Sequence, residues 1–276
     1  AASHLAKGDL SQRVPVRGRD ELALLAQTFN QMAASLEQAE ANRKVMTSDI
    51  AHELRNPLAV VRANIEALQD GIYPLTPENL EPLLAQTDLL SRLVEDLRML
   101  ALADAGQLRL HFVPGDLAAL ARRALEPFEA QAAARTITLE FIESNPCPAL
   151  LLDPGRVGQI LHNLLSNALR HTPDGGRVTL GVRCDPTEAR LTLRDTGSGI
   201  PEGSLPRLFE RCYRADRSRS REEGGTGLGL AIARQFAEAH GGSLTAANHP
   251  EGGAVFTLRL PVREGGGNWE LGIGYG

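Results

Sequence analysis

The stretch of residues 45–70, VMTSDIAHELRNPLAVVRANIEALQD, carries apolar residues at steps of three and four. This spacing gathers them on one face of a helix. A segment with one glycine and two prolines, 71–77, interrupts the pattern, and a second long apolar stripe follows over 80–100. The two stripes predict an antiparallel hairpin of long helices, whose apolar faces one hairpin cannot bury fully. We therefore expect two copies to form a four-helix bundle, a homodimer; the alternative is a monomeric hairpin docked on the C-terminal part of the chain.

The same periodicity divides the rest of the chain. Residues 20–40 predict one amphipathic helix, opened by the acidic Asp20 and Glu21, and residues 8–19 predict a connector. After about Gly106 the pattern changes to mixed helical and strand-like segments. Helices are expected near 116–133, 154–170 and 228–240, and strands near 136–142, 177–184, 189–195, 243–248 and 253–260. The predicted fold class is therefore multidomain, an all-α hairpin followed by an α+β two-layer sandwich.

Charge and lysine usage exclude several classes of function. Lys7 and Lys44 are the only lysines among 29 basic residues. Chemistry that needs a lysine late in the chain is excluded, as in P-loop NTPases and protein kinases with a strand lysine. The 34 acidic residues give a formal net charge of −5, which argues against non-specific wrapping of nucleic acid. No run of about 18 apolar residues occurs, so we expect no membrane-spanning helix.

Three cysteines, Cys147, Cys184 and Cys212, are widely spaced and odd in number. They form neither a CxxC pair nor an obvious disulfide framework, a pattern that suits a reducing compartment. We expect them to be three small, buried or half-buried side chains.

One histidine within the first predicted hairpin helix has unusual neighbours. His52 lies beside the apolar stripe, where a lone histidine is ordinarily a surface residue. Glu53 can accept a hydrogen bond from one ring nitrogen and leave the other nucleophilic. Asn56 stands one turn away on the same face, and Pro57 removes a backbone donor and is expected to kink the helix.

Four polar residues share one face of the helix predicted near 154–170 and its continuation to 171: Asn163, Asn167, Arg170 and His171. Amide oxygens bind hard cations and arginine binds phosphate. The face therefore suits a magnesium–nucleotide complex, with an ordinary solvent-exposed polar face as the alternative.

Two glycine-rich segments flank a long predicted loop, 198–227. The first, 195–199 (DTGSG), places a carboxylate at a strand end, where it can accept a hydrogen bond from an exocyclic amine. The second, 225–229 (GTGLG), leads into a predicted helix whose first amides can bind an anion, and its spacing fits neither a P-loop nor a Rossmann fingerprint. Five arginines within 211–221 favour either a nucleic-acid patch or a phosphate-binding lid.

In this order, the motifs closely resemble those of the dimeric sensor histidine kinases of two-component signalling. His52 and its flanks resemble the H box, 163–171 the N box, 195–199 the G1 box, 209–214 the F box and 225–229 the G2 box, while 8–36 resembles the later half of a HAMP module. The resemblance implies a partial HAMP module and linker helix over 1–40, a dimerisation and phosphotransfer hairpin over 41–105, a GHKL-type ATP-binding domain over 106–263 and a flexible tail over 264–276.

The resemblance also implies roles for single residues. His52 would be the phosphoacceptor, Glu53 its acid–base partner, and Asn56 would orient a water during removal of phosphate from the partner protein. Asn167, helped by Asn163, would hold Mg²⁺.

The remaining implied roles concern ATP. Asp195 would bind the adenine amine, and Arg214 would reach the γ-phosphate. The other implied nucleotide-binding residues are Asn163, Asn167, Arg170, His171, Gly197, Gly199, Gly225, Gly227, Leu228 and Gly229. Arg170 stands where relatives often have a lysine, and His171 stands where an aromatic ring is frequent.

The implied activity is autophosphorylation of His52 with ATP and Mg²⁺, followed by phosphoryl transfer to an aspartate on the receiver domain of a response regulator. Dephosphorylation of that regulator is also expected, and binding of nucleic acid is not. The resemblance further implies the cytoplasmic portion of a bacterial inner-membrane receptor, as a soluble fragment without its transmembrane sensor. Two alternatives are an ATPase that uses nucleotide closure mechanically, as Hsp90, gyrase and MutL do, and a catalytically silent dimer that relays conformation.

Overall fold

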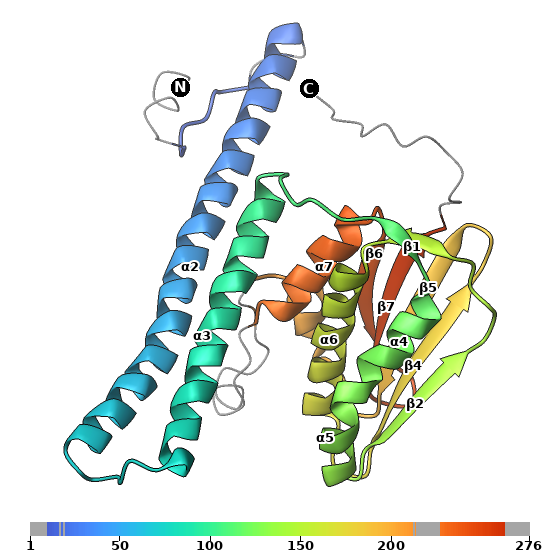
Figure 1. Cartoon of the computed structure of the whole chain (residues 1–276). Helices are drawn as coiled ribbons and strands as arrows, with labels where there is room; N and C mark the ends of the chain where they lie inside the picture. Colours follow the sequence, from blue (N-terminus) through green and yellow to red (C-terminus); the bar gives the residue numbers. More distant parts are fainter. Residues whose placement is uncertain (1–9, 17, 19, 212, 214–226, 263–276) are drawn as a thin grey trace. The chain divides into compact units, whose positions relative to one another are not determined.

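The computed structural model describes residues 10–16, 18, 20–211, 213 and 227–262, and of residues 39, 41–49, 52 and 53 it describes only the helical backbone. The chain forms two compact units, Ala1–Leu90 and Ser91–Gly276 (Figure 1). The first unit is helical, and the second combines helices with sheet.

The first unit is dominated by one long helix, α2 (Glu21–Gln69). Asp20 caps its N-terminus, since the carboxylate accepts a hydrogen bond from the Ala23 amide at 3.0 Å. The sequence predicted a helix over 20–40 and a helical stripe that continues from 45 to about 70. α2 runs through both without a break, because residues 41–44 contain neither glycine nor proline. The helix also continues through Pro57.

After the turn at residues 70–76 the chain enters α3 (Pro77–Asp104), whose first part returns antiparallel to α2 (Figure 1). Many large apolar side chains of this hairpin are exposed in the single chain. They include Leu22, Leu24, Leu25, Met32, Leu36, Leu58, Val60, Ile65, Leu80 and Leu84. No helix in the described residues is both long enough and apolar enough to cross a membrane.

The second unit contains a five-stranded sheet in the order β2-β4-β5-β7-β6. Its strands are β2 (Thr138–Glu143), β4 (Arg177–Cys184), β5 (Glu188–Asp195), β6 (Ser243–Asn248) and β7 (Ala254–Pro261). β2 pairs with β4 in parallel, and the other neighbours are antiparallel. The central strands alternate buried and accessible residues, as expected for a sheet covered on one face.

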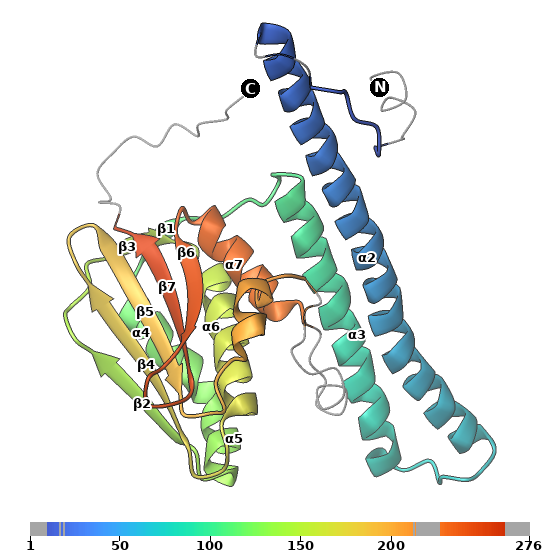
Figure 2. The ribbon, with the colours of Figure 1, turned by 180° about the vertical axis from the view of Figure 1, so that it is seen from behind.

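Helices cover that face. They are α4 (Leu117–Leu125), the short α5 (Glu129–Ala134), α6 (Pro154–His171) and α7 (Gly229–Ala239). Figure 2 shows the opposite face of the sheet, which carries no helix. A helical hairpin followed by a two-layer sandwich is therefore confirmed as the fold class.

Several local predictions differ from the structure. The helix expected over 116–133 is divided by the 3₁₀ turn Glu126–Phe128, because Pro127 cannot donate a helical hydrogen bond. The loop expected over 198–227 contains another 3₁₀ helix, η2 (Glu202–Arg207). Two short strands, β1 (Val113–Gly115) and β3 (Leu150–Leu152), were not predicted, since three residues are too few for a readable alternation.

The expectation of three separate cysteines is wrong for two of them. Cys147 and Cys184 form a disulfide, with their Cα atoms 5.2 Å apart. They are 37 residues apart in sequence, but the parallel pairing of β2 with β4 brings the loop after β2 beside the end of β4. Cys212 lies outside the described residues.

Candidate nucleotide site and phosphoacceptor helix

Asp195 is buried at the end of β5, with 3% of its surface exposed. Its Oδ1 atom accepts hydrogen bonds from the backbone amides of Gly197 at 2.8 Å and Ala254 at 3.1 Å. No hydrogen bond to Oδ2 is recorded among the described residues. The two amides therefore fix the carboxylate and leave one of its oxygens available as a directed acceptor.

Two glycines allow backbone segments to pack closely around Asp195. A Cβ atom on Gly197 would lie 2.3 Å from the carbonyl oxygen of His171, at the end of α6. A Cβ on Gly253 would lie 1.9 Å from the carbonyl oxygen of Asp195, and Gly253 also has a positive φ of 84°. Glycine is required at both positions because any side chain would push these segments apart.

Asn248, at the end of β6, was not singled out from the sequence. Its Oδ1 accepts a hydrogen bond from the amide of Ile200, and its Nδ2 donates to the carbonyl of Ile200, both at 2.7 Å. The neighbouring Gly199 has φ = +74°. Asn248 therefore holds the exit of the glycine turn after Asp195, and no sequence signal links residues that lie 48 positions apart.

Helix α6 places its apolar side chains in the core and its polar ones at the edge. Asp153 caps its N-terminus by accepting a hydrogen bond from the Arg156 amide at 3.1 Å. Asn163 is half-buried, and its Nδ2 donates to the carbonyl of Gly229 at 2.8 Å, which ties α6 to the start of α7. This bond uses the Nδ2 atom of Asn163, so the Oδ1 atom remains an acceptor.

The next polar residues on α6 lie toward its C-terminus. Asn167 is half-buried, and no hydrogen bond of its side chain is recorded among the described residues. Arg170 is half-buried and His171 is exposed. Asn163 and Asn167, one turn apart, thus present two amide oxygens that fit a hard cation.

Arg135 supports this end of α6 and was also missed from the sequence. Its guanidinium donates to the carbonyls of Leu169 and Thr172, each at 2.7 Å, and pairs with Asp174 at 2.9 Å. Helix C-terminal carbonyls lack partners within the helix, so a cation there stabilises the end of α6. Arg135 belongs to the turn after α5, and its sequence context gives no sign of this role.

Only part of the second glycine motif is described. Gly227 has a positive φ of 69°, Leu228 is buried with 2% exposure, and Gly229 begins α7. Gly225 and Arg214 lie outside the described residues.

The segment after η2 contacts the end of α3. Arg211 forms an ion pair with Asp104, and the Tyr213 hydroxyl donates to Ser204 at 2.9 Å. These contacts join the segment after η2 to the end of α3 and to Ser204 within η2.

His52, Glu53 and Asn56 lie on α2, in the first compact unit. Of His52 and Glu53 only the helical backbone is described, whereas the Asn56 side chain is exposed. In the second unit, the structure places Gly197 and Asp195 against the end of α6 and joins Asn163 to the start of α7. The histidine motif lies on the other unit.

The residues present fit a magnesium–nucleotide complex. Asp195 offers a buried acceptor, and α6 offers amide oxygens and Arg170. Within the described residues, no group of three or more His, Cys, Asp and Glu could hold a metal ion. A Mg²⁺ ion that takes most of its ligands from phosphates and water needs only one or two protein oxygens.

Three family models match the chain. "Histidine kinase-, DNA gyrase B-, and HSP90-like ATPase" matches residues 152–264, "HAMP domain" matches 1–38, and "His Kinase A (phospho-acceptor) domain" matches 42–106.

Curated proteins and solved structures agree with these matches. The chain is 42% identical over 259 residues to the signal transduction histidine-protein kinase BaeS of Escherichia coli, covering 94% of this chain and 55% of BaeS. The histidine kinase AdeS of Acinetobacter baumannii has a similar structure, with a TM-score of 0.65 and 27% identity over 77% of this chain and 98% of that one. Full-length ShkA in complex with AMPPNP gives a TM-score of 0.60 and 29% identity over 80% of this chain and 45% of ShkA. The chain spans about half the length of the curated relatives it matches.

Proposed function

This chain belongs to the sensor histidine kinases, with HAMP, HisKA and HATPase_c domains, and we propose that it is an ATP-dependent protein-histidine kinase that phosphorylates its own His52. The observation that carries the proposal is the buried Asp195 carboxylate, which two backbone amides fix in a turn that packs against the C-terminal end of α6. The match to the ATPase model and the likeness to ShkA, whose structure holds AMPPNP, support nucleotide binding.

Adenine recognition follows from the orientation of Asp195. The amides of Gly197 and Ala254 occupy Oδ1, so Oδ2 accepts the hydrogen bond of the exocyclic amine. In a buried site this bond discriminates strongly, because a base lacking the amine would leave the carboxylate unsatisfied. Gly197 and Gly199 shape the backbone around the ring.

Residues of α6 and of the second glycine motif would neutralise the negative charge of the ATP phosphates. The amide oxygens of Asn167 and Asn163 would hold Mg²⁺, which would offset charge on the phosphates. Arg170 adds a permanent positive charge on the same helix face, and Arg214 approaches the γ-phosphate. Residues 225–229, with Gly225, Gly227, Leu228 and Gly229, close over the triphosphate, and His171 lies against the nucleotide.

Phosphoryl transfer requires one nucleophile and one base. A neutral ring nitrogen of His52 attacks the γ-phosphorus in line, so that an N–P bond forms and the P–O bond to ADP breaks. Glu53 accepts a hydrogen bond from the other ring nitrogen and takes up the proton released by the ring.

The later steps and partners are also part of the proposal. The phosphoryl group of His52 passes to an aspartate on the receiver domain of a response regulator, and Asn56 orients water when the enzyme dephosphorylates that regulator. The hairpin forms a homodimer, which would cover the exposed leucines of α2 and α3. The HAMP match supports the proposal that this chain is the cytoplasmic portion of a bacterial inner-membrane receptor.

The test is incubation with γ-labelled ATP and Mg²⁺. We expect acid-labile, alkali-stable label on the wild-type chain, none on His52→Ala, and none on Asn167→Ala, which should remain dimeric. Acid-stable label, or label that survives His52→Ala, would contradict the assignment. ATP hydrolysis without any label would instead indicate a mechanical ATPase, and nucleotide binding without turnover would indicate a silent relay.

A further inference from the structure

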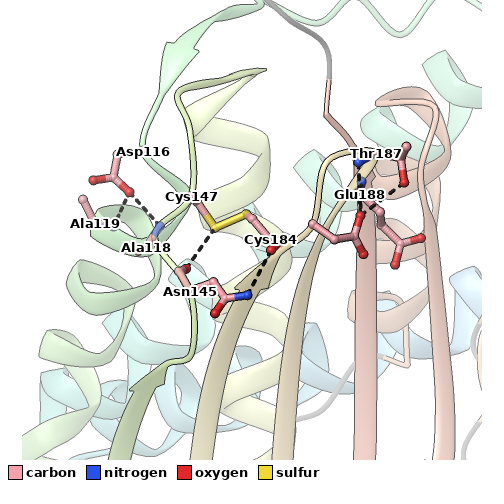
Figure 3. Close-up of a disulfide and its surroundings, with 9 residues drawn as sticks. Asp116, Ala118, Ala119, Asn145, Cys147, Cys184, Thr187 and Glu188 are labelled. Atoms are coloured by element: carbon pink, nitrogen blue, oxygen red, sulfur yellow. Dashed lines mark hydrogen bonds between the residues drawn. A yellow bond between two sulfur atoms is a disulfide. The ribbon is translucent and has the colours of Figure 1, made fainter.

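The disulfide between Cys147 and Cys184 joins two parts of the sandwich that are held very differently. Figure 3 shows the bridge between the loop before β3 and the end of β4. On the Cys184 side, the turn to β5 is tied by the Asp185 carboxylate, which accepts hydrogen bonds from the Thr187 amide at 3.1 Å and the Glu188 amide at 2.8 Å. Cys184 is therefore fixed by the sheet whether or not the bridge is present.

The Cys147 side is held weakly. The amide of Ser144 donates to Val182 at 3.0 Å, the last backbone bond of this chain segment to β4. Between there and β3, the described residues show one side-chain hydrogen bond to the sheet, from Asn145 to the carbonyl of Cys184 at 3.5 Å. The covalent bridge is thus the main connection between this loop and the sheet.

The loop that contains Cys147 leads directly into β3, where the linker from α3 joins the sandwich. β3 pairs with β1, the first strand after the linker. Asp153, which follows β3, accepts a hydrogen bond from the His111 amide at 2.9 Å and caps α6. These hydrogen bonds lower the pKa of Asp153, although burial alone would raise it.

A buried histidine completes this junction. The Asp153 amide donates to Nε2 of His240 at 3.1 Å, and the Phe112 ring packs edge-on against the His240 ring at 5.4 Å. The linker, β3 and the start of α6 therefore share one set of contacts, and the chain from Cys147 enters them through β3.

The bridge is open to small reagents. Cys147 is half-buried, whereas Cys184 is buried with 6% exposure. A hollow of about 310 Å³ lies beside the bridge, lined in part by Pro146, Pro148 and Cys184. A small disulfide or thiol can reach Cys147 first.

We propose that Cys147 and Cys184 are a reversible redox modification site that responds to low-molecular-weight disulfides and thiols. The Cys147 thiolate attacks one sulfur of the small disulfide, whose S–S bond breaks and releases one thiolate. The Cys184 thiolate then attacks Cys147 Sγ, forms the protein disulfide and releases the second thiolate. Two protein thiols are oxidised, one small disulfide is reduced to two thiols, and the two protons pass to these products.

Formation of the bridge fixes the anchor of the linker without touching the nucleotide site. Cys184 and Asp195 lie at opposite ends of the β4–β5 pair, since Val178 faces Asp195 and Cys184 faces Ala189. Reduction should therefore leave the KM for ATP unchanged. It should lower the autophosphorylation rate severalfold, because a loosely anchored linker positions the sandwich less often for transfer to His52. This last consequence rests on the proposed function.

The experiment compares the full chain after treatment with oxidised glutathione and after dithiothreitol. Oxidation should lower the intact mass by two hydrogens without adding glutathione, and peptide mapping should link Cys147 to Cys184. Reduction should lower the Tm of the sandwich by about 5–10 °C, as loss of a cross-link over a loop of this length implies. Cys147→Ser and Cys184→Ser should match the reduced protein under both treatments, and Cys212→Ser should respond like the wild type.

Free thiols that persist in oxidised glutathione, a bridge to Cys212, or the same Tm shift in Cys147→Ser would overturn the proposal. If the serine variants do not fold, the mass and Tm of the wild type in the two redox states still decide it. Equal autophosphorylation rates in both states would refute the regulatory consequence. Absence of phosphohistidine in both states would instead count against the proposed function, because mass and Tm do not depend on kinase activity.

Discussion

In the helical unit, Leu22 and Leu84 leave 72% and 66% of their surface exposed. In the sandwich, Leu164, Leu191 and Leu258 are completely buried. Both regions are rich in leucine and both show clear periodicity, but only the sandwich has a second layer within the same chain. From this difference we expect the sandwich to fold by itself and the hairpin to need another surface, which we expect to be a second copy.

The largest effect should come from the sandwich core. Leu191→Ala on β5 should lower the free energy of unfolding by about 3–4 kcal/mol, because it removes buried methyl groups and leaves a cavity. Urea unfolding followed by circular dichroism measures this change. The matched control is Leu84→Ala, which should change the unfolding of the sandwich by less than about 0.5 kcal/mol. Equal losses of unfolding free energy in the two variants would contradict the difference in packing between the hairpin and the sandwich.

The second prediction concerns the dimer. Leu84→Asp should raise the dimer dissociation constant at least about 100-fold, since a carboxylate would be desolvated at an apolar interface. Analytical ultracentrifugation over a range of concentrations gives the constant. The Tm of the sandwich serves as the control and should not move. A wild-type chain that is monomeric at all concentrations would favour the docked monomeric hairpin.

A smaller effect is expected at the nucleotide end of the sandwich. Asn248→Ala removes two hydrogen bonds to Ile200 and should raise the KM for ATP about tenfold, equivalent to about 1–2 kcal/mol. The kcat should change little, because Asn248 positions the loop and does not touch the reacting atoms. Asn248→Asp keeps the acceptor and loses the donor, so its KM should be intermediate. A fall in kcat with unchanged KM would show that Asn248 affects the chemical step and does not position the loop for ATP binding.

The smallest effect concerns a carboxylate on α3. Burial, with a further contribution from Glu95, raises the pKa of Asp96 from 3.8 to about 6. A carboxyl group whose pKa is raised on folding favours the folded state when protonated, so this contribution is full below about pH 4 and is lost as pH rises through about 6. Asp96→Asn should therefore stabilise the chain at pH 8 by about 1 kcal/mol, after allowance for partial exposure, and by nothing at pH 4.

Denaturant unfolding at the two pH values measures this difference. The exposed Glu81→Gln on the same helix is the control and should leave the free energy of unfolding unchanged at both. A gain for Asp96→Asn that is the same at pH 4 and pH 8 would show that packing, rather than charge, is responsible.

Much of the molecule was predictable because its signals are local. The spacing of apolar residues on α2, α3 and α6 predicted helices, and alternation predicted the five long strands. Asp195 and the glycines of the turn after it could be singled out because they are adjacent in sequence. Pro127 is a local signal for the helix boundary at Glu126–Phe128, whereas the strands β1 and β3 are too short to carry a pattern.

The type of each long element and the chemistry along each helix face follow from the amino-acid sequence alone, since both depend on neighbours within a few residues. The contacts between distant residues come from the three-dimensional fold: Asn248 with Ile200, Arg135 with the end of α6, and Cys147 with Cys184. These contacts depend on strand order and register, which arise from the packing of the whole sheet. A residue 37 or 87 positions from its partner has no local signal of it, as the disulfide and the bond between Asp153 and His240 both show.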